Sequence, residues 1–129
     1  MFYHIVKRQN PIDRKIEKFH ASPVYGDDVT IKELAGEISD SCTLNITDVE
    51  AVLSTMVRKL PAYLKGGRIV QLGEFGRMKL SFSCKGQDES DKVTAEKIEN
   101  PRIVFTPCME LKDELKKTTF TRMDLKKDK

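Results

Sequence analysis

The chain has 129 residues and a mass of 14.7 kDa, which fits one domain of common size and excludes a TIM barrel or two full-sized domains. Hydrophobic residues make up 39% and charged residues 33%, so we expect a globular chain with a modest core and a strongly solvated surface. No run approaches the ~20 apolar residues of a membrane helix, and the first ten residues lack the apolar segment of a secretory signal. We therefore expect a cytoplasmic protein with no membrane partner.

The net charge of +3 is too small by itself to indicate a polyanionic partner, but the charge is unevenly distributed. Residues 26–60 carry 3 basic and 7 acidic side chains, whereas residues 61–82 carry 4 basic and 1 acidic side chain. Acidic helices beside basic strands would give one positive face, which is typical of nucleic-acid binding. An ordinary surface of mixed charge is the alternative at this point.

The sequence contains no motif that indicates an enzyme or a bound cofactor. The three cysteines, Cys42, Cys84 and Cys108, are an odd number at wide spacing, which argues against a disulfide framework and against a CxxC zinc site. No Walker loop, GxGxxG, GxSxG or HExxH sequence occurs. We expect no catalysis, no cofactor, no metal and no small-molecule substrate. A cysteine-dependent enzyme is the remote alternative.

The first 25 residues predict a small β element. Residues 2–7 are rich in β-branched and aromatic side chains and predict a strand, and Asn10-Pro11 opens a basic loop. Residues 18–22 predict a returning strand that Pro23 ends. Such a hairpin is too small to be an independent domain.

Two helices follow, each introduced by a capping box. The boxes are Thr30–Glu33 and Thr47–Glu50, in which a hydroxyl and a carboxylate satisfy free backbone amides. An apolar stripe of more than four turns extends from Val49 to Leu64, and Pro61 within it predicts a kink or a helix end. Gly66-Gly67 predicts the C-cap.

A helix-turn-helix is one interpretation of these two helices. In that motif the N-terminal face of the second helix reads bases in the major groove. Here that face carries Asp48 and Glu50, whose carboxylates would repel phosphates, and the helix is unusually long and apolar. We therefore rank this interpretation lower.

A strand is predicted at residues 68–72, followed by a tight turn at 73–76 and a strand from Arg77 to Cys84. In this second strand, apolar side chains alternate strictly with small or basic ones, so one face should be buried and the solvent face basic. Residues 85–100 have few apolar side chains and predict an arm that cannot fold on its own. A return strand is expected at residues 102–106.

The C-terminal part predicts one more helix, with Thr106 as N-cap and Pro107 at its first position, ending near Lys117. Residues 120–123 predict a short strand, and the remaining residues a frayed basic tail.

The order of helix, helix, hairpin, arm, strand and short helix resembles the HU and integration-host-factor family of bacterial DNA-bending proteins. Residues 69–76 (IVQLGEFG) resemble the hairpin motif VxLxGFGxF of that family. Residues 104–107 (VFTP), with Leu111-Lys112-Asp113, resemble its ending VxFxPGxxLKD. Tyr3, Val6 and Asn10-Pro11 are similar to the start of the extended HU-like branch found in Bacteroidetes.

The resemblance implies an α+β fold of the HU/IHF type, with a two-helix base, a β-sheet bearing a protruding β-arm, and a short C-terminal helix. It implies an intertwined dimer, expected to be a homodimer, whose arms reach around the DNA minor groove. It divides the chain into a β extension at residues 1–25 packed on the core, an HU-like DNA-binding domain at 26–117 with its arm at about 83–101, and a strand and basic tail at 118–129.

The sequence departs from the family at the arm. The family's arm tip has an RNPxTG-type sequence with a wedging proline, whereas this chain has the acidic residues 86–91 (GQDESD) there. Met109 occupies the place of a phosphate-binding lysine, and Ser81 and Ser83 fall where the family tends to place arginines. Sharp bending by intercalation is therefore not expected.

The expected function is non-enzymatic, weakly sequence-specific binding of double-stranded DNA in the nucleoid, with modest bending. The alternative is an HU-fold protein-interaction or assembly module that has lost strong DNA binding, since the arm tip is acidic and an added edge strand can pair with another chain. The candidate phosphate-binding cations are Arg77 and Lys79 on the basic strand face, Lys85, Lys92 and Lys97 along the arm, Arg102 on the return strand, and Lys112 on the last helix.

Overall fold

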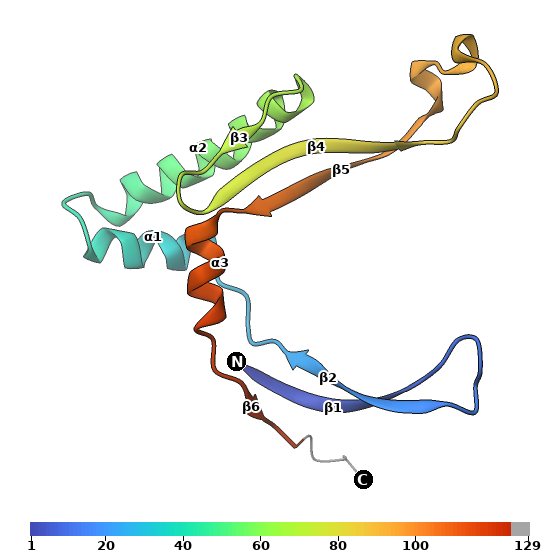
Figure 1. The fold of residues 1–129 in the computed structure, drawn as a ribbon. Helices are drawn as coiled ribbons and strands as arrows, with labels where there is room; N and C mark the ends of the chain where they lie inside the picture. The colour runs from blue at the N-terminus through green and yellow to red at the C-terminus, as the bar shows by residue number, and fades with distance from the viewer. Residues whose placement is uncertain (125–129) are drawn as a thin grey trace. The chain divides into compact units, whose positions relative to one another are not determined.

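The computed structural model describes residues 1–124, which form an α+β fold of three α-helices and two three-stranded sheets (Figure 1). The chain divides into two compact units. One contains residues 1–28 and the segment that begins at Glu114, and the other contains residues 29–113. None of the helices described in residues 1–124 is long and apolar enough to cross a membrane.

The first unit is built on the N-terminal hairpin. Strand β1 (Phe2–Gln9) pairs antiparallel with β2 (Glu17–Val24), and the short β6 (Thr121–Arg122) pairs parallel with β1 on its other side. All three strands were expected, but β2 continues through Pro23 where the sequence predicts an end. A proline that lacks an N–H is tolerated there because β2 is an edge strand. The predicted basic tail lies outside the described residues from residue 125 onward.

The second unit begins with helix α1 (Ile31–Asp40), whose cap is the predicted one. The Thr30 hydroxyl oxygen accepts a hydrogen bond from the Glu33 amide at 3.2 Å. Helix α2 (Ile46–Lys65) is capped by Asn45, whose Oδ1 accepts from the Asp48 amide at 2.8 Å. The predicted cap at Thr47 is wrong, because Asn45 is an equally good acceptor and stands two residues earlier.

Helix α2 continues through Pro61 as far as Lys65, so the proline does not end it. The predicted C-cap is confirmed, since the Gly66 amide donates to the Ala62 carbonyl at 3.2 Å.

The second sheet has the order β3-β4-β5 and is antiparallel throughout. Its strands are β3 (Val70–Gln71), β4 (Gly76–Cys84) and β5 (Ile98–Pro107). Gly73 turns the chain between β3 and β4 with a φ of 55°, which a residue with a Cβ rarely adopts. Gly76 is needed for close approach, because a Cβ there would lie 2.5 Å from the Thr106 carbonyl oxygen. Figure 1 shows β4 and β5 as a long ribbon that extends beyond the helices of its unit.

Helix α3 (Met109–Lys116) begins later than the sequence predicts. Thr106 and Pro107 still belong to β5, where they lie opposite Arg77 and Gly76. The first helical hydrogen bond is accepted by the Cys108 carbonyl, from the Lys112 amide at 3.0 Å. The predicted cap at Thr106 is therefore wrong, because sheet pairing keeps Thr106 and Pro107 in the strand.

Few apolar side chains are fully covered within the single chain. In residues 1–124 only Ala35, Val49 and Leu64 form the buried hydrophobic core. The large apolar side chains of Phe75 and Met56 are 54% and 41% exposed. The apolar faces of α2 and of the β4–β5 ribbon are thus left largely open.

Candidate nucleic-acid interface

A row of basic side chains lies on one face of the β4–β5 ribbon. Arg77 and Lys79 are two residues apart on β4, so their side chains leave the same face of the sheet. Ser81, the next residue on that face, lies opposite Arg102 of β5. Residues directly opposite in an antiparallel pair share a face. Register therefore brings Arg77, Lys79 and Arg102 together on one exposed surface, which we call the basic ribbon face.

The Arg102 guanidinium is held on this face by two hydrogen bonds. Its Nη1 donates to the Ser83 hydroxyl at 2.9 Å and to the Asn100 carbonyl at 3.4 Å. Asn100 has a φ of 53° at a β-bulge, where the register shifts between Ser81 and Ser83. Such a bulge adds a residue to one strand and increases the local twist. Ser83 is two residues after Ser81 on β4 and leaves the same face, where the Arg102 side chain reaches its hydroxyl.

The opposite face of the ribbon is apolar. Met78 and Leu80 lie opposite Phe105 and Ile103, and Phe82 continues the series on β4. The exposed fraction of these side chains reaches 59% at Ile103 and 51% at Phe82. The alternation predicted for β4 is confirmed, but its apolar face is not buried within this chain.

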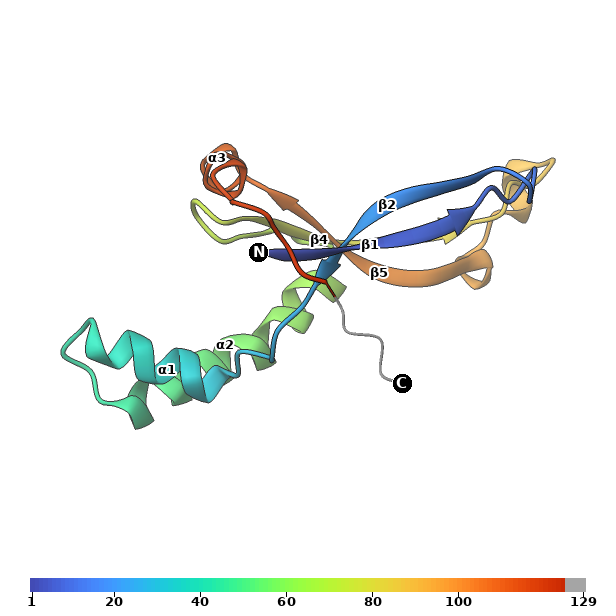
Figure 2. The same ribbon diagram turned by 90° about the horizontal axis from the view of Figure 1, so that it is seen from below.

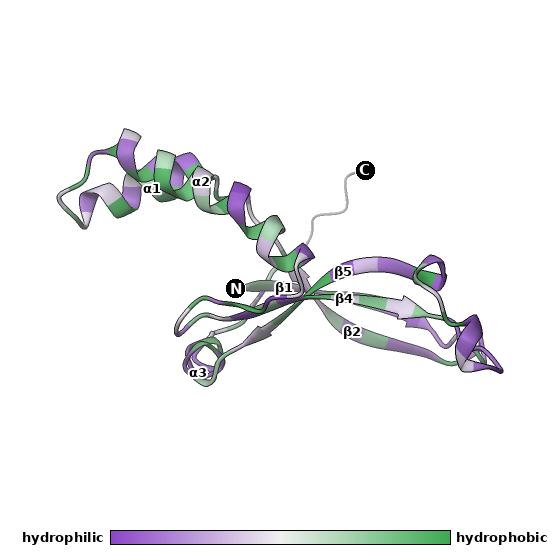
Figure 3. Ribbon diagram, turned by 90° about the horizontal axis from the view of Figure 1, so that it is seen from above, coloured by the Kyte–Doolittle hydropathy of each residue, from purple (hydrophilic) through white to green (hydrophobic). Residues whose placement is uncertain are grey.

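Beyond Cys84 the ribbon ends in an acidic tip. Two short 3-10 turns, η1 (Ser90–Lys92) and η2 (Ala95–Lys97), connect β4 to β5. Residues 85–99 hold three lysines against five carboxylates. Figure 3 colours the outer part of β5 and these turns mostly as hydrophilic. The candidate residues Lys85, Lys92 and Lys97 are exposed, but they lie among carboxylates.

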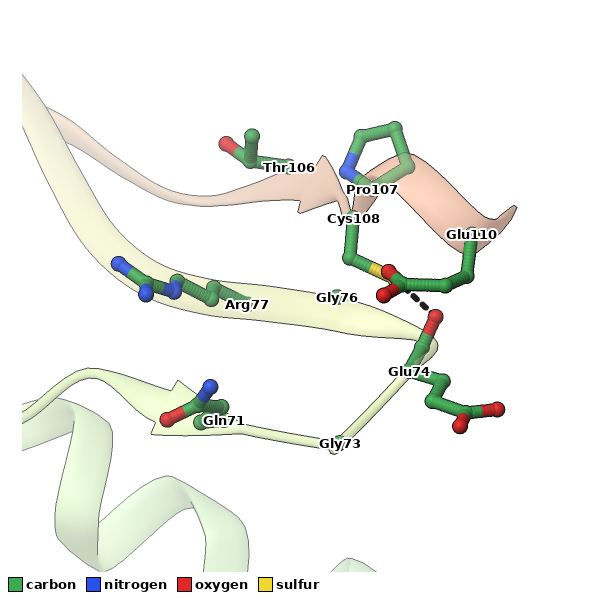
Figure 4. Close-up of a pocket in the computed structure, with 9 residues that line it drawn as sticks. All are labelled: Gln71, Gly73, Glu74, Gly76, Arg77, Thr106, Pro107, Cys108 and Glu110. Atoms are coloured by element: carbon green, nitrogen blue, oxygen red, sulfur yellow. Dashed lines mark hydrogen bonds between the residues drawn. The ribbon is translucent and has the colours of Figure 1, made fainter. Parts of the chain in front are cut away.

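A hollow of about 510 Å³ lies at the base of the ribbon, between the β3–β4 turn and the start of α3 (Figure 4). The Cys108 thiol lies against the carbonyl oxygen of Glu74 there. A hydrogen bond from its own backbone amide lowers the pKa of the Glu110 carboxyl below its ordinary value. Arg77 lines the hollow and extends away from both carboxylates in Figure 4. Two negative charges make this hollow unsuitable for a phosphate.

The structure groups some of the predicted DNA-binding residues and separates others. Arg77, Lys79 and Arg102 form one row, Lys85 follows directly after β4, and Lys92 and Lys97 lie on the 3-10 turns. Lys112 is exposed on α3 and does not belong to the ribbon. Ser83 was not predicted as the partner of Arg102. The alternating pattern places Ser83 on the basic ribbon face, but the pairing register was needed to bring the two together.

The chain matches the HU-HIG family model, described as an HU domain fused to wHTH, Ig, or glycine-rich motif, over residues 1–122. The chain belongs to the HU-HIG family. The predicted resemblance to HU-like proteins is thereby confirmed. Within residues 1–124 no group of three or more His, Cys, Asp or Glu side chains is placed to hold a metal ion.

One similar solved structure is a crystal structure from Bacteroides vulgatus ATCC 8482, named "Putative bacterial DNA binding protein". It superposes on 98% of this chain with a TM-score of 0.60 at 12% sequence identity, which shows a shared fold. This chain spans 50% of the length of that protein. No curated protein matches the HU-HIG chain.

Proposed function

We propose that this HU-HIG protein binds double-stranded DNA through its phosphates, with weak sequence specificity and without catalysis. The observation that carries the proposal is the basic ribbon face, where Arg77, Lys79 and Arg102 stand in a row with no carboxylate paired to them in residues 1–124. Arginine and lysine contacts to phosphates provide affinity and positioning but read no base sequence. A protein of this kind would act in the cytoplasm, in the nucleoid.

The acidic tip argues for modest bending. Proteins that kink DNA sharply insert apolar wedges between base pairs and place cations in the minor groove. The tip offers Asp88, Glu89 and Asp91 instead, and the residues that the structure describes there include no proline. Bending would then come from phosphate contacts along the ribbon and from the deformability of the DNA.

We further propose that the active form is a homodimer. Val52, Met56 and Tyr63 lie four and seven residues apart on α2, which places them on one face, and they are 62%, 41% and 47% exposed. Each half-exposed side chain of this size that becomes buried stabilises an assembly by about 1 kcal/mol. The open apolar face of the β4–β5 ribbon adds to this surface, and a second copy of the chain would cover both.

The dimer is tested by sedimentation equilibrium, which should give twice the mass of 14.7 kDa. Met56→Glu should shift the protein to monomer, because it places a charge in the proposed apolar interface. Ala51→Glu adds the same charge at an exposed position about 140° around α2 from Met56, so it is the matched control and should leave the dimer intact. A monomeric mass for the unaltered protein would refute the dimer.

DNA binding is tested by fluorescence-anisotropy titration of a linear and a nicked duplex at two salt concentrations. Micromolar binding that weakens steeply with salt and prefers the nicked duplex would support contacts to phosphates on deformable DNA. Absence of binding at low salt would refute the proposal. It would favour the second candidate, a protein-interaction module that uses the acidic tip.

A further inference from the structure

The face of the N-terminal hairpin that carries Arg8 and Lys18 has a charge arrangement that the fold itself does not explain. The register of β1 and β2 places Arg8 directly opposite Lys18. Like charges directly opposite across two strands repel and destabilise a sheet. Two residues of the same charge at this position therefore cost the hairpin stability unless an anion lies between them.

No carboxylate of the hairpin relieves this repulsion. Between residues 1 and 25 the only acidic side chains are Asp13 and Glu17. Glu17 lies opposite Gln9 and forms an ion pair with Lys7, on the face of the hairpin that does not carry Arg8 and Lys18. Asp13 accepts a hydrogen bond from the Lys15 amide within the loop, at 3.0 Å. In residues 1–124 no ion pair joins Arg8 or Lys18 to any carboxylate.

The two cations border a hollow of about 360 Å³ at the loop end of the hairpin. His20, which follows on the same face opposite Val6, also borders it, as do Asn10 and Ile16. The Asn10 amide donates to the Ile16 carbonyl at 2.9 Å, and the Asn10 side chain accepts from the Ile12 amide at 2.9 Å. The loop is thus fixed by its own hydrogen bonds. Figure 2 shows β1 and β2 as a ribbon that leads to this loop.

We propose that this hairpin face is a second DNA-contacting surface, in which Arg8 and Lys18 clamp one backbone phosphate of a duplex. A guanidinium offers a fork of donors to phosphate oxygens, and a lysine ammonium adds a point charge from the other strand. Binding a phosphate turns the repulsion across the strands into attraction to a shared anion. The inference rests on the proposed DNA-binding function and extends the contact beyond the β4–β5 ribbon.

The test compares the salt dependence of duplex binding for the full chain and for Arg8→Ala/Lys18→Ala. Losing one phosphate contact per subunit of a dimer should reduce the slope of log K against log[salt] by about 2. With an unchanged affinity at 1 M salt, this slope change corresponds to about sixtyfold weaker binding at 0.1 M. Lys116→Ala/Lys117→Ala removes the same net charge from exposed positions at the end of α3 and its following turn, and is the matched control.

Two further measurements separate a phosphate contact from a structural role. The urea midpoint of Arg8→Ala/Lys18→Ala should not fall, because the substitution removes a repulsion. The exchange Arg8→Lys/Lys18→Arg keeps both charges and should retain the slope of the unaltered protein. A lower urea midpoint for the alanine variant would overturn the clamp. So would a smaller slope of log K against log[salt] for the exchange variant.

The outcomes distinguish this inference from the proposed function. The unaltered protein could bind duplex DNA with a steep slope of log K against log[salt], and Arg8→Ala/Lys18→Ala could bind equally well. The clamp is then refuted, and the proposed DNA binding through the basic ribbon face stands. In that case the two cations protect a strand edge or face a protein. If the unaltered protein does not bind DNA at low salt, both are refuted.

Discussion

The basic ribbon face predicts how strongly salt should weaken DNA binding. In the proposed homodimer, Arg77, Lys79 and Arg102 of the two subunits would make six phosphate contacts, which gives a slope of log K against log[salt] of about −5. Affinity should then fall about a thousandfold between 50 and 200 mM salt. Contacts by the proposed hairpin clamp would steepen the slope by about 2 more, so the change between variants is the decisive quantity.

Replacing Arg77 and Lys79 by alanine removes four of these contacts and should reduce the slope by about 3.6. The measurement is fluorescence anisotropy with one duplex at several salt concentrations. Lys116→Ala/Lys117→Ala loses the same net charge outside the ribbon, and its slope should stay near that of the unaltered protein. Equal slopes for the two double variants would refute the assignment, because net charge alone would then account for the binding.

Two further predictions concern stability, and both are measured by urea unfolding. Gly76→Ala should lower the free energy of unfolding by about 1–3 kcal/mol, because its Cβ would overlap the Thr106 carbonyl and the ring of Phe105. Gly86→Ala, where no atom lies within 4 Å, should change it by less than about 0.5 kcal/mol, and equal losses would contradict the packing argument. Asn45→Ala should lower the free energy of unfolding by about 1 kcal/mol, and Thr47→Ala should lower it much less. The reverse order would support the cap at Thr47 that the sequence predicts.

Features that depend on neighbouring residues could be predicted from the sequence. The alternation from Arg77 to Cys84 predicts a strand with one basic face, since strand side chains alternate with a period of two. The Thr30 cap and the Gly66 stop follow from local hydrogen-bonding chemistry, and both are observed. The order of elements and two short motifs were sufficient to predict an HU-like family. The expectation that residues 1–25 pack on the core stays a prediction.

Only the tertiary structure decided which residues face one another. The pairing of β4 with β5 brings Arg102 to Ser83, and it keeps Thr106 in β5 instead of at a helix cap. Register likewise sets Arg8 against Lys18, which no local pattern reveals because the loop between them leaves several pairings open. Local sequence thus determined the type of each element and the charge of its faces. The strand register was determined only by long-range pairing, because register depends on contacts between residues far apart in the chain.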